Sequence, residues 1–383
     1  MQYKPFVFMS IFVYSFFSIN NIFAISNQQL VVKENKDPKA VFSYWTAEHL
    51  QNAKPIDLPK ADLHLVKQIL VSQFPQQQHS ISQEGVPPSV HITPDSTLLF
   101  DPSTTSSTSV DNSNSLQASL NDYGSLGAQF SSSQLVPLAA NLTYPYSAVG
   151  KLYFTIPNKG DYVCSASVIG PRVILTAGHC VHSGSGGETG YYTNWLFIPA
   201  YSLGNAPYKT WGYSFVVTTS SWMNGGGAVP NLADYAMLEL QDQTINNVLT
   251  PVGSLTGRLG YATNRVLPLM PNHAHILGYP CNFDRCSIMH VTTAQSFRAV
   301  SPSNVEYGSD SGGGASGGPW VQNFGVPSNG QAGGQNPLFN KVIGVSSYNY
   351  LNPAVLVLGS SILGDQFNGL LAVVCNHKAG NCN

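Results

Sequence analysis

The larger, C-terminal part of the chain carries the pattern that most restricts its fold. From Tyr144 onward, short runs rich in Val, Ile, Tyr, Phe and Thr recur between clusters of Gly, Pro and Asn. Such runs are typical of short β-strands joined by turns, so they predict an all-β barrel or sandwich. Strands and helices do not alternate regularly, which argues against an α/β architecture. The clearest expected strands are residues 151–156, 163–169, 172–176, 215–219, 235–240, 275–278 and 341–347.

Composition divides the chain at about residue 144. Residues 40–74 have the apolar spacing of short helices, interrupted by Pro55 and Pro59. Residues 75–135 are rich in Gln, Ser and Thr and carry few large apolar groups, which predicts a linker or a loose stretch. We therefore expect a partly helical, partly disordered pro-segment over residues 25–143 and a folded domain over residues 144–383.

The N-terminus predicts export. A lysine precedes residues 6–23, an uncharged run rich in Phe, Ile and Val, and Ala24 offers a small residue for signal-peptidase cleavage. A signal peptide over residues 1–24 would yield a secreted protein without stable membrane association. The alternative is a transmembrane anchor, because a run of about 18 apolar residues can span a bilayer. Two asparagines interrupt the run, which favours the signal peptide.

Charge excludes one class of partner. Charged residues make up 9% of the chain, whereas an average soluble domain has about 25%. Lys and Arg number 17 against 19 Asp and Glu, for a formal net charge of −2. A surface without a basic excess is unsuited to a phosphate backbone, so nucleic acid is not an expected partner.

All six cysteines lie in the expected folded domain. An even number in an exported chain predicts three disulfides, and among the possible connectivities the spacing favours three local pairs. Zinc binding is the alternative, but no Cys-x2-Cys pattern occurs, so we expect neither a metal nor a cofactor. The favoured pairs are Cys164–Cys180, Cys281–Cys286 and Cys375–Cys382.

Three short segments carry reactive side chains in the order His, Asp, Ser. The first presents His179 in a tight turn after a β-rich run, and the second places Asp234 at the start of an apolar strand. The third sets Ser316 in a glycine loop, where the backbone can approach a ligand closely. The segments are Leu175-Thr176-Ala177-Gly178-His179-Cys180, Leu232-Ala233-Asp234-Tyr235-Ala236-Met237-Leu238 and Gly312-Gly313-Gly314-Ala315-Ser316-Gly317-Gly318-Pro319-Trp320.

This combination of side chains suits acyl transfer. A serine hydroxyl becomes a good nucleophile when a base takes its proton, and an imidazole with an ordinary pKa of about 6.5 can do so at neutral pH. A buried carboxylate fixes the tautomer of that ring and stabilises the imidazolium. We therefore assign Ser316 as nucleophile, His179 as base and acid, and Asp234 as the orienting group. The backbone N–H groups of Gly314 and Ser316 are candidates for an oxyanion hole.

Each assignment has an alternative. The glycine loop could be a flexible turn, and Asp234 could simply cap its strand. His182, three residues after His179, raises the possibility of a His-x-x-His metal site, but no Glu follows the first histidine. Rival carboxylates are Asp161, Asp242 and Asp310. The histidines expected to be ordinary surface or core residues are His273, His275, His290 and His377.

The motifs resemble those of secreted chymotrypsin-like serine proteases, and within them the bacterial glutamyl-endopeptidase branch. The resemblance extends over about residues 144–383 and implies two perpendicular six-stranded antiparallel barrels, at about 144–250 and 251–383, with the active site between them. It also implies the Cys164–Cys180 bridge and a hydrogen bond from Ser347 to the triad carboxylate. The matching residues are Thr176-Ala177-Gly178-His179-Cys180, Asp234-Tyr235-Ala236-Met237-Leu238 and Ala315-Ser316-Gly317-Gly318-Pro319.

Two departures from trypsin-like enzymes bear on activation and specificity. Ala315 stands where those enzymes carry an Asp that receives the new N-terminus, so that salt bridge cannot activate this chain. Asp310 lies where trypsin-like enzymes bind basic side chains, but Asn349 replaces the Gly that keeps the pocket open. Specificity stays open between basic and acidic side chains, and Asp310, Ser347 and Asn349 are candidate substrate-binding residues.

The pro-segment offers few sites for self-cleavage. Residues 68–150 contain no Lys or Arg, and no Asp or Glu occurs between Asp122 and Asp161. Neither a basic-specific nor an acidic-specific enzyme could therefore cut itself near residue 144. We expect that another protease trims this zymogen or that the pro-segment stays attached.

The leading hypothesis is a secreted, monomeric serine endopeptidase that hydrolyses proteins or peptides through an acyl-enzyme intermediate. One alternative is a catalytically silent binding or adhesin-like protein on a protease scaffold, and the complete His, Asp and Ser set favours the enzyme. Another alternative is an esterase that uses the same triad, because the two activities share their chemistry.

Overall fold

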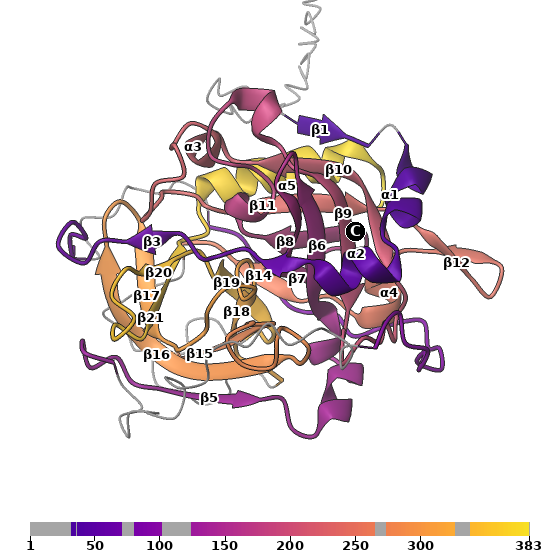
Figure 1. The fold of residues 1–383 in the computed structure, drawn as a ribbon, viewed down its shortest axis with the longest axis horizontal. Helices are drawn as coiled ribbons and strands as arrows, with labels where there is room; N and C mark the ends of the chain where they lie inside the picture. The colour runs from indigo at the N-terminus through magenta and orange to yellow at the C-terminus, as the bar shows by residue number, and fades with distance from the viewer. Residues whose placement is uncertain are drawn as a thin grey trace, which may run out of the picture.

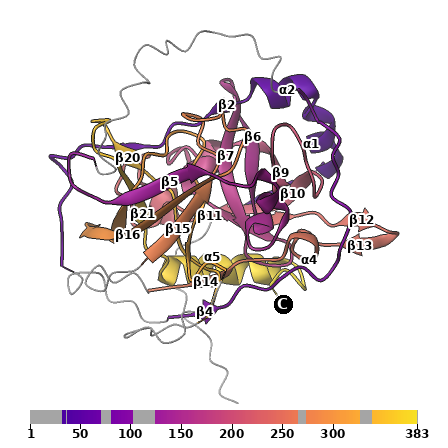
Figure 2. The same cartoon turned by 90° about the horizontal axis from the view of Figure 1, so that it is seen from below.

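A computed structural model describes residues 32–35, 37–70, 80–101, 124–264, 273–325 and 338–382. Within these residues the fold is mostly β, with two rings of strands and few helices (Figure 1). The expected all-β class is therefore confirmed. The long C-terminal helix lies along one face of the strands, and the N-terminal part of the chain runs over the outside (Figure 2).

Six antiparallel strands form the first barrel. They pair in the order β6-β7-β8-β11-β10-β9, and β9 also pairs with β6, which closes the ring. The five strands expected between residues 151 and 240 are all among them. The bounds are β6 Val149–Ile156, β7 Gly160–Val168, β8 Val173–Thr176, β9 Thr193–Pro199, β10 Trp211–Thr218 and β11 Ala236–Leu240.

A second antiparallel ring has the order β19-β18-β15-β16-β17-β21. A bridge between Tyr348, three residues after β19, and Gly359 of β21 closes it. The bounds are β15 His273–Gly278, β16 His290–Val300, β17 Asn304–Gly308, β18 Pro319–Gln322, β19 Lys341–Val345 and β21 Val357–Ser361. The smaller elements around the rings are α3 Ser220–Met223, β12 Gln243–Ile245, β13 Val248–Thr250, α4 Val252–Thr256, β14 Gly260–Ala262 and β20 Asn349–Tyr350.

Mostly apolar sequences explain why the central strands of the first barrel are buried on both faces. Strands β8 and β11 pair with each other and are buried along their whole length. Apart from Thr176 and Glu239 their residues are apolar, as is typical of strands covered on both sides. One side of β11 faces the barrel, and helix α5 (Asp365–His377) covers it from outside.

Helix α5 is not among the elements expected from the sequence. Phe367 is fully buried, and its ring centroid lies 6.0 Å from that of Tyr235 and 5.5 Å from that of Tyr261. The helical spacing of the apolar residues is present in the sequence, but Gly369 in the middle of the run weakens the signal. The buried residues of the helix are Phe367, Leu370, Leu371 and Val374.

Upstream of the barrels, the expectation of helices over residues 40–74 is only partly right. The helices α1 (Pro38–Tyr44) and α2 (Ala47–Asn52) end before the first internal proline. The chain then becomes extended and forms β2 (Lys54–Pro55) and β3 (Lys60–Ala61). Proline lacks the N–H that a helix needs and biases the preceding residue toward extended backbone, which explains the difference.

Within the expected linker over residues 75–135, two short stretches of the described residues form strands. Strand β4 (Ser82–Gln83) pairs with β14, and β5 (Phe130–Gln134) pairs with β16 over five residues. Farther upstream, strand β1 (Val32–Glu34) pairs antiparallel with β10 of the first barrel. The polar side chains of β5 gave no periodic apolar signal, and its pairing is through the backbone. The predicted signal peptide lies outside the described residues.

Three disulfides join Cys164 to Cys180, Cys281 to Cys286 and Cys375 to Cys382. These are the local pairs that the spacing favours, and they leave no cysteine thiol for a metal. In the described part of the chain, no helix combines the length and the hydropathy needed to cross a membrane.

Lys151 of β6 is a buried amine in the first barrel. Its Nζ lies 5.0 Å from the ring centroid of Tyr153 and 4.5 Å from that of Tyr201, a geometry that favours the charged form. Burial disfavours the charge more strongly and lowers the pKa of Lys151 from 10.5 to about 7. The unfolded chain regains the ordinary pKa.

The free energy of unfolding should therefore rise as the pH increases from about 7 toward 10.5, because the unfolded state binds a proton there that the folded state has released. The expected contribution of Lys151 to the slope is about 1.4 kcal/mol per pH unit. Urea unfolding across this range measures the slope. Lys151→Met should lower the slope by that contribution, whereas Lys159→Met, at an exposed position, should leave it unchanged. An unchanged slope in Lys151→Met contradicts the prediction.

Candidate active site

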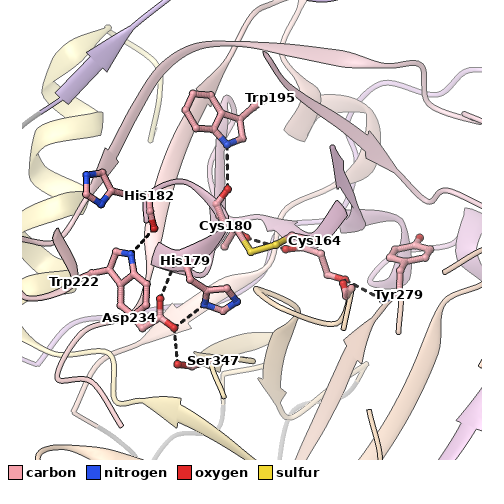
Figure 3. The surroundings of a disulfide bond; sticks show 12 residues. Cys164, His179, Cys180, His182, Trp195, Trp222, Asp234, Tyr279 and Ser347 are labelled. Carbon is pink, nitrogen blue, oxygen red and sulfur yellow. Dashed lines mark hydrogen bonds and ion pairs between the residues drawn. A yellow bond between two sulfur atoms is a disulfide. The ribbon is translucent and has the colours of Figure 1, made fainter. Parts of the chain in front are cut away.

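The carboxylate of Asp234, two residues before β11, brings the two barrels together. It is completely buried. Its Oδ1 accepts the backbone N–H of His179 at 2.9 Å, and its Oδ2 lies 2.8 Å from Nδ1 of the same residue. The hydroxyl of Ser347 donates to Oδ2 at 2.6 Å (Figure 3). The backbone N–H of Asp234 donates to the hydroxyl of Ser361 at 3.0 Å.

These hydrogen-bond partners of Asp234 come from both rings of strands. His179 follows β8 of the first barrel, whereas Ser347 follows β19 and Ser361 ends β21 of the second. A buried carboxylate is tolerated when hydrogen bonds replace its water shell. The hydrogen bonds that offset the burial of this carboxylate therefore form completely only when the two barrels are docked.

The turn that carries His179 is a short 3₁₀ helix, Gly178–Cys180. The disulfide from Cys180 to β7 anchors it, and the indole of Trp195 donates to the carbonyl of Cys180 at 3.2 Å (Figure 3). Trp222 packs beside the imidazole, with 5.9 Å between ring centroids. Because the carboxylate faces Nδ1, it favours the tautomer with a proton on Nδ1 and leaves Nε2 as the acceptor.

Glycine is required at two positions beside Ser316. Gly314 has φ +89°, and a Cβ there would lie 2.6 Å from the carbonyl oxygen of Tyr279. Gly317 has φ +78°, and a Cβ there would lie 2.0 Å from the hydroxyl of Thr176. Residues with a side chain rarely adopt such positive φ angles, and other atoms already fill the space that a Cβ would need at both positions. The glycine loop is thus a packed turn with a defined conformation.

Ser165 of β7 holds this turn and is not among the residues that the sequence motifs single out. Its backbone N–H donates to the carbonyl of Ser316 at 2.7 Å, and its hydroxyl donates to the carbonyl of Gly314 at 2.9 Å. The same hydroxyl accepts the backbone N–H of Tyr279 at 2.9 Å. A serine beside Cys164 belongs to no motif, so only its position next to a disulfide could have drawn attention to it.

Ser316 and His179 are both buried, with 0% and 4% exposure. Their reactive atoms, Oγ and Nε2, are buried and accept or donate no hydrogen bond within the described chain. The backbone N–H of Gly314 donates to the carbonyl oxygen of Ile56 at 3.2 Å. One of the two N–H groups expected in an oxyanion hole therefore already binds a carbonyl oxygen.

Of the candidate specificity residues, Asp310 precedes the glycine turn in the sequence and Asn349 begins β20. Burial raises the pKa of the Asp310 carboxyl, and a hydrogen bond with Ser132 partly offsets that effect. Oδ1 of Asp310 and Oδ1 of Asn349 are buried with no hydrogen-bond partner among the described residues. The backbone N–H of Asn349 donates to the carbonyl of Pro59 at 3.2 Å. A buried polar atom without a partner calls for an explanation, and a bound ligand is one that fits a residue of the candidate substrate site.

The remaining candidates have other partners. His182 contacts the carbonyl of Gly187 through Nε2 and the N–H of Gly184 through Nδ1. The ring centroids of His273 and His275 lie 5.2 Å apart on β15. In the described part of the chain no group of three or more His, Cys, Asp or Glu could hold a metal ion. The other carboxylates and histidines of the sequence analysis contact partners elsewhere: Asp161 contacts His49, Asp242 contacts Arg172, His290 contacts Asp284 and His377 contacts Glu239.

Comparison with known proteins gives one family. The family model described as Trypsin matches residues 143–355. An extracellular metalloprotease of Bacillus subtilis is 24% identical over 234 residues, which cover 61% of this chain and 65% of that protein. A glutamyl endopeptidase of Bacillus licheniformis is 26% identical over 137 residues, or 36% of this chain and 37% of that protein. The chain thus spans less than two thirds of either relative.

Among solved structures, a thermostable serine protease, AL20, from an extremophilic microorganism is 25% identical to this chain, with a TM-score of 0.49. The match covers 61% of this chain and 98% of that one.

Ser347→Ala should lower the free energy of unfolding by about 1–3 kcal/mol, because the buried Asp234 carboxylate loses a donor that nothing replaces. Urea unfolding at neutral pH measures the change. Ser183→Ala removes a hydroxyl that donates to a carbonyl on the surface and should change stability by less than about 0.5 kcal/mol. Equal effects of the two substitutions would show that the Ser347 bond contributes nothing to folding.

Proposed function

This chain belongs to the trypsin family of chymotrypsin-like serine proteases, and on that premise we propose that it is an active serine endopeptidase. Its substrates are proteins or peptides, and hydrolysis passes through an acyl-enzyme intermediate. The observation that carries the proposal is the pairing of the buried Asp234 carboxylate with both the backbone N–H and the ring of His179. That pairing leaves Nε2 of the imidazole as a base.

In the first half of the reaction, Oγ of Ser316 attacks the carbonyl carbon of the scissile bond while Nε2 of His179 takes its proton. The N–H groups of Gly314 and Ser316 stabilise the negative charge that develops on the carbonyl oxygen. The imidazolium then protonates the leaving nitrogen, the C–N bond breaks, and an ester of Ser316 remains.

In the second half, water attacks this ester and gives its proton to Nε2. The tetrahedral intermediate collapses, Oγ of Ser316 regains a proton from the imidazolium, and the acid product leaves. Asp234 stabilises the imidazolium in both halves without taking up a proton. Ser347 keeps the carboxylate in place, and Ser165 keeps the turn that carries the nucleophile in place.

The specificity of the site is proposed only in outline. Asp310 and Asn349 present buried oxygens without hydrogen-bond partners in the described chain, which supports a role in binding substrate side chains. An esterase with the same triad remains the second candidate, because the same atoms would cleave an ester.

Export, processing and assembly belong to the same proposal. Three disulfides support an oxidising compartment, and the N-terminal sequence supports a cleaved signal peptide over residues 1–24. We propose a zymogen with a pro-segment over residues 25–143, a protease domain over residues 144–383 and a monomeric, secreted product.

A fluorophosphonate probe should label the wild-type protein, once its N-terminal region has been trimmed, on Ser316. Ser316→Ala should abolish labelling and lower casein hydrolysis by a factor on the order of 10⁴ to 10⁶. Ser185→Ala, at an exposed position, should leave both unchanged. Trimmed wild-type protein that neither reacts with the probe nor cleaves casein would overturn the proposal. Ester hydrolysis without casein cleavage would favour the esterase.

A further inference from the structure

Residues 54–61, which we call the crossing segment, run from α2 toward the second barrel across the front of both barrels (Figure 1). The segment is extended and carries two prolines. On the first barrel, its strand β2 pairs in parallel with β7, and the N–H of Ile56 donates to the carbonyl of Val163 at 3.2 Å. Val163 precedes the cysteine that anchors the His179 turn.

On the second barrel, the same segment pairs with β20. Strand β3 runs parallel to it, and the N–H of Asn349 donates to the carbonyl of Pro59 at 3.2 Å. The N–H of Leu351 donates to the carbonyl of Ala61 at 3.0 Å. The crossing segment therefore forms backbone hydrogen bonds with Asn349 and Leu351, which follow Ser347 closely in the sequence.

The middle of the crossing segment lies against the turn that carries the nucleophile. The carbonyl oxygen of Ile56 accepts the N–H of Gly314. A Cβ on Gly313 would meet that oxygen at 3.0 Å, the Asp57 carboxylate at 3.2 Å and the Pro55 side chain at 3.2 Å. The segment is thus in van der Waals contact with the residues just before Ser316.

Leu58 points into the protein between these two sets of backbone bonds. It is 1% exposed and belongs to the apolar cluster of the second barrel, with Ile343 and Leu358. Its neighbours Asp57 and Lys60 are exposed. Leu58 is therefore the side chain that anchors the segment.

The flanks of the segment are fixed as well. Before it, the indole of Trp45 donates to the carbonyl of Asn194 at 2.6 Å, and Tyr44 donates to Asp161 at 2.7 Å. After it, Ile69 donates from its backbone to the carbonyl of Ala299 at 3.1 Å. These contacts hold the segment to both barrels from both ends.

We propose that the crossing segment is an intramolecular ligand of the substrate cleft that keeps the uncut protein inactive, with Leu58 in a subsite that takes aliphatic side chains. The proposal rests on the proposed function. The N–H groups of Gly314 and Asn349, which a bound peptide would use, are already engaged by the carbonyls of Ile56 and Pro59. A substrate can reach the buried Ser316 only after the segment leaves.

The sequence provides a way to remove it. Lys54, Lys60 and Lys67 are all exposed, and no Lys or Arg follows until Lys151, which is buried. A protease that cuts after lysine would therefore sever the crossing segment itself while finding no such site in the following stretch. This agrees with activation by another enzyme.

The test compares rates of fluorophosphonate labelling in the full chain before and after limited digestion with immobilised trypsin, which is then removed. Mass spectrometry confirms cleavage after Lys60 and Lys67, because Pro55 protects the bond after Lys54 from trypsin. Digested Ser316→Ala serves as the blank. We expect the cut protein to react at least about tenfold faster than the intact one. Intact Leu58→Asp should be similarly accelerated, whereas Leu65→Asp, at a position 81% exposed in the same region, should behave as wild type.

The outcomes separate the two proposals. If intact and cut wild type react equally fast, the crossing segment does not block the site, and the proposed function stands. If neither the cut protein nor Leu58→Asp reacts, the proposed function fails, and this inference fails with it. A folded Leu58→Asp protein, judged by near-UV circular dichroism, that stays as slow as wild type overturns the role of Leu58.

A synthetic peptide of residues 53–62 tests the subsite without any variant of the protein. It should inhibit the cut protein competitively, and peptides with Leu58→Lys or Leu58→Glu should inhibit at least about tenfold more weakly, because neither charge can be buried in an apolar cluster without a partner. Equal inhibition by all three peptides would overturn the aliphatic subsite.

Discussion

The burial of one carboxylate organises this molecule. An ionised Asp234 without water is costly unless donors surround it, and those donors lie on chain segments more than a hundred residues apart. The first barrel supplies the backbone and the ring of His179, and the second supplies Ser347. The buried carboxylate that orients the His179 ring therefore needs hydrogen bonds from both barrels, and this need also fixes how the two barrels dock.

A second set of bonds across the same interface positions the nucleophile. Ser165 contacts the carbonyls of Ser316 and Gly314 and the N–H of Tyr279, so a first-barrel strand holds a second-barrel turn. Because neither barrel carries a complete site, alignment of the three reactive groups depends on both interfaces forming together. Because Gly314 and Gly317 are tightly packed, the turn that carries Ser316 cannot easily change its conformation if one barrel shifts relative to the other.

The sequence predicts most of the barrel strands and brings the right three segments to attention, because strand periodicity and short motifs are local signals. It does not predict α5, where Gly369 weakens a helical pattern, nor the role of Ser165, which depends on partners 149 and 114 residues away. The prolines of the crossing segment read as helix breaks, and nothing local shows that an extended stretch between them lies over Ser316. Backbone pairing between segments far apart in the sequence cannot be predicted from the local amino-acid composition.

Strand β5 has a consequence for where the mature protein can begin. Its five residues cover one edge of β16, from His290 to Ala294, with backbone bonds. A product that started at residue 144 would lack this strand and would offer an open β-edge, a template on which a second copy or another extended peptide could add. Retaining residues 130–134 keeps that edge closed, so processing upstream of Phe130 would yield the more soluble enzyme.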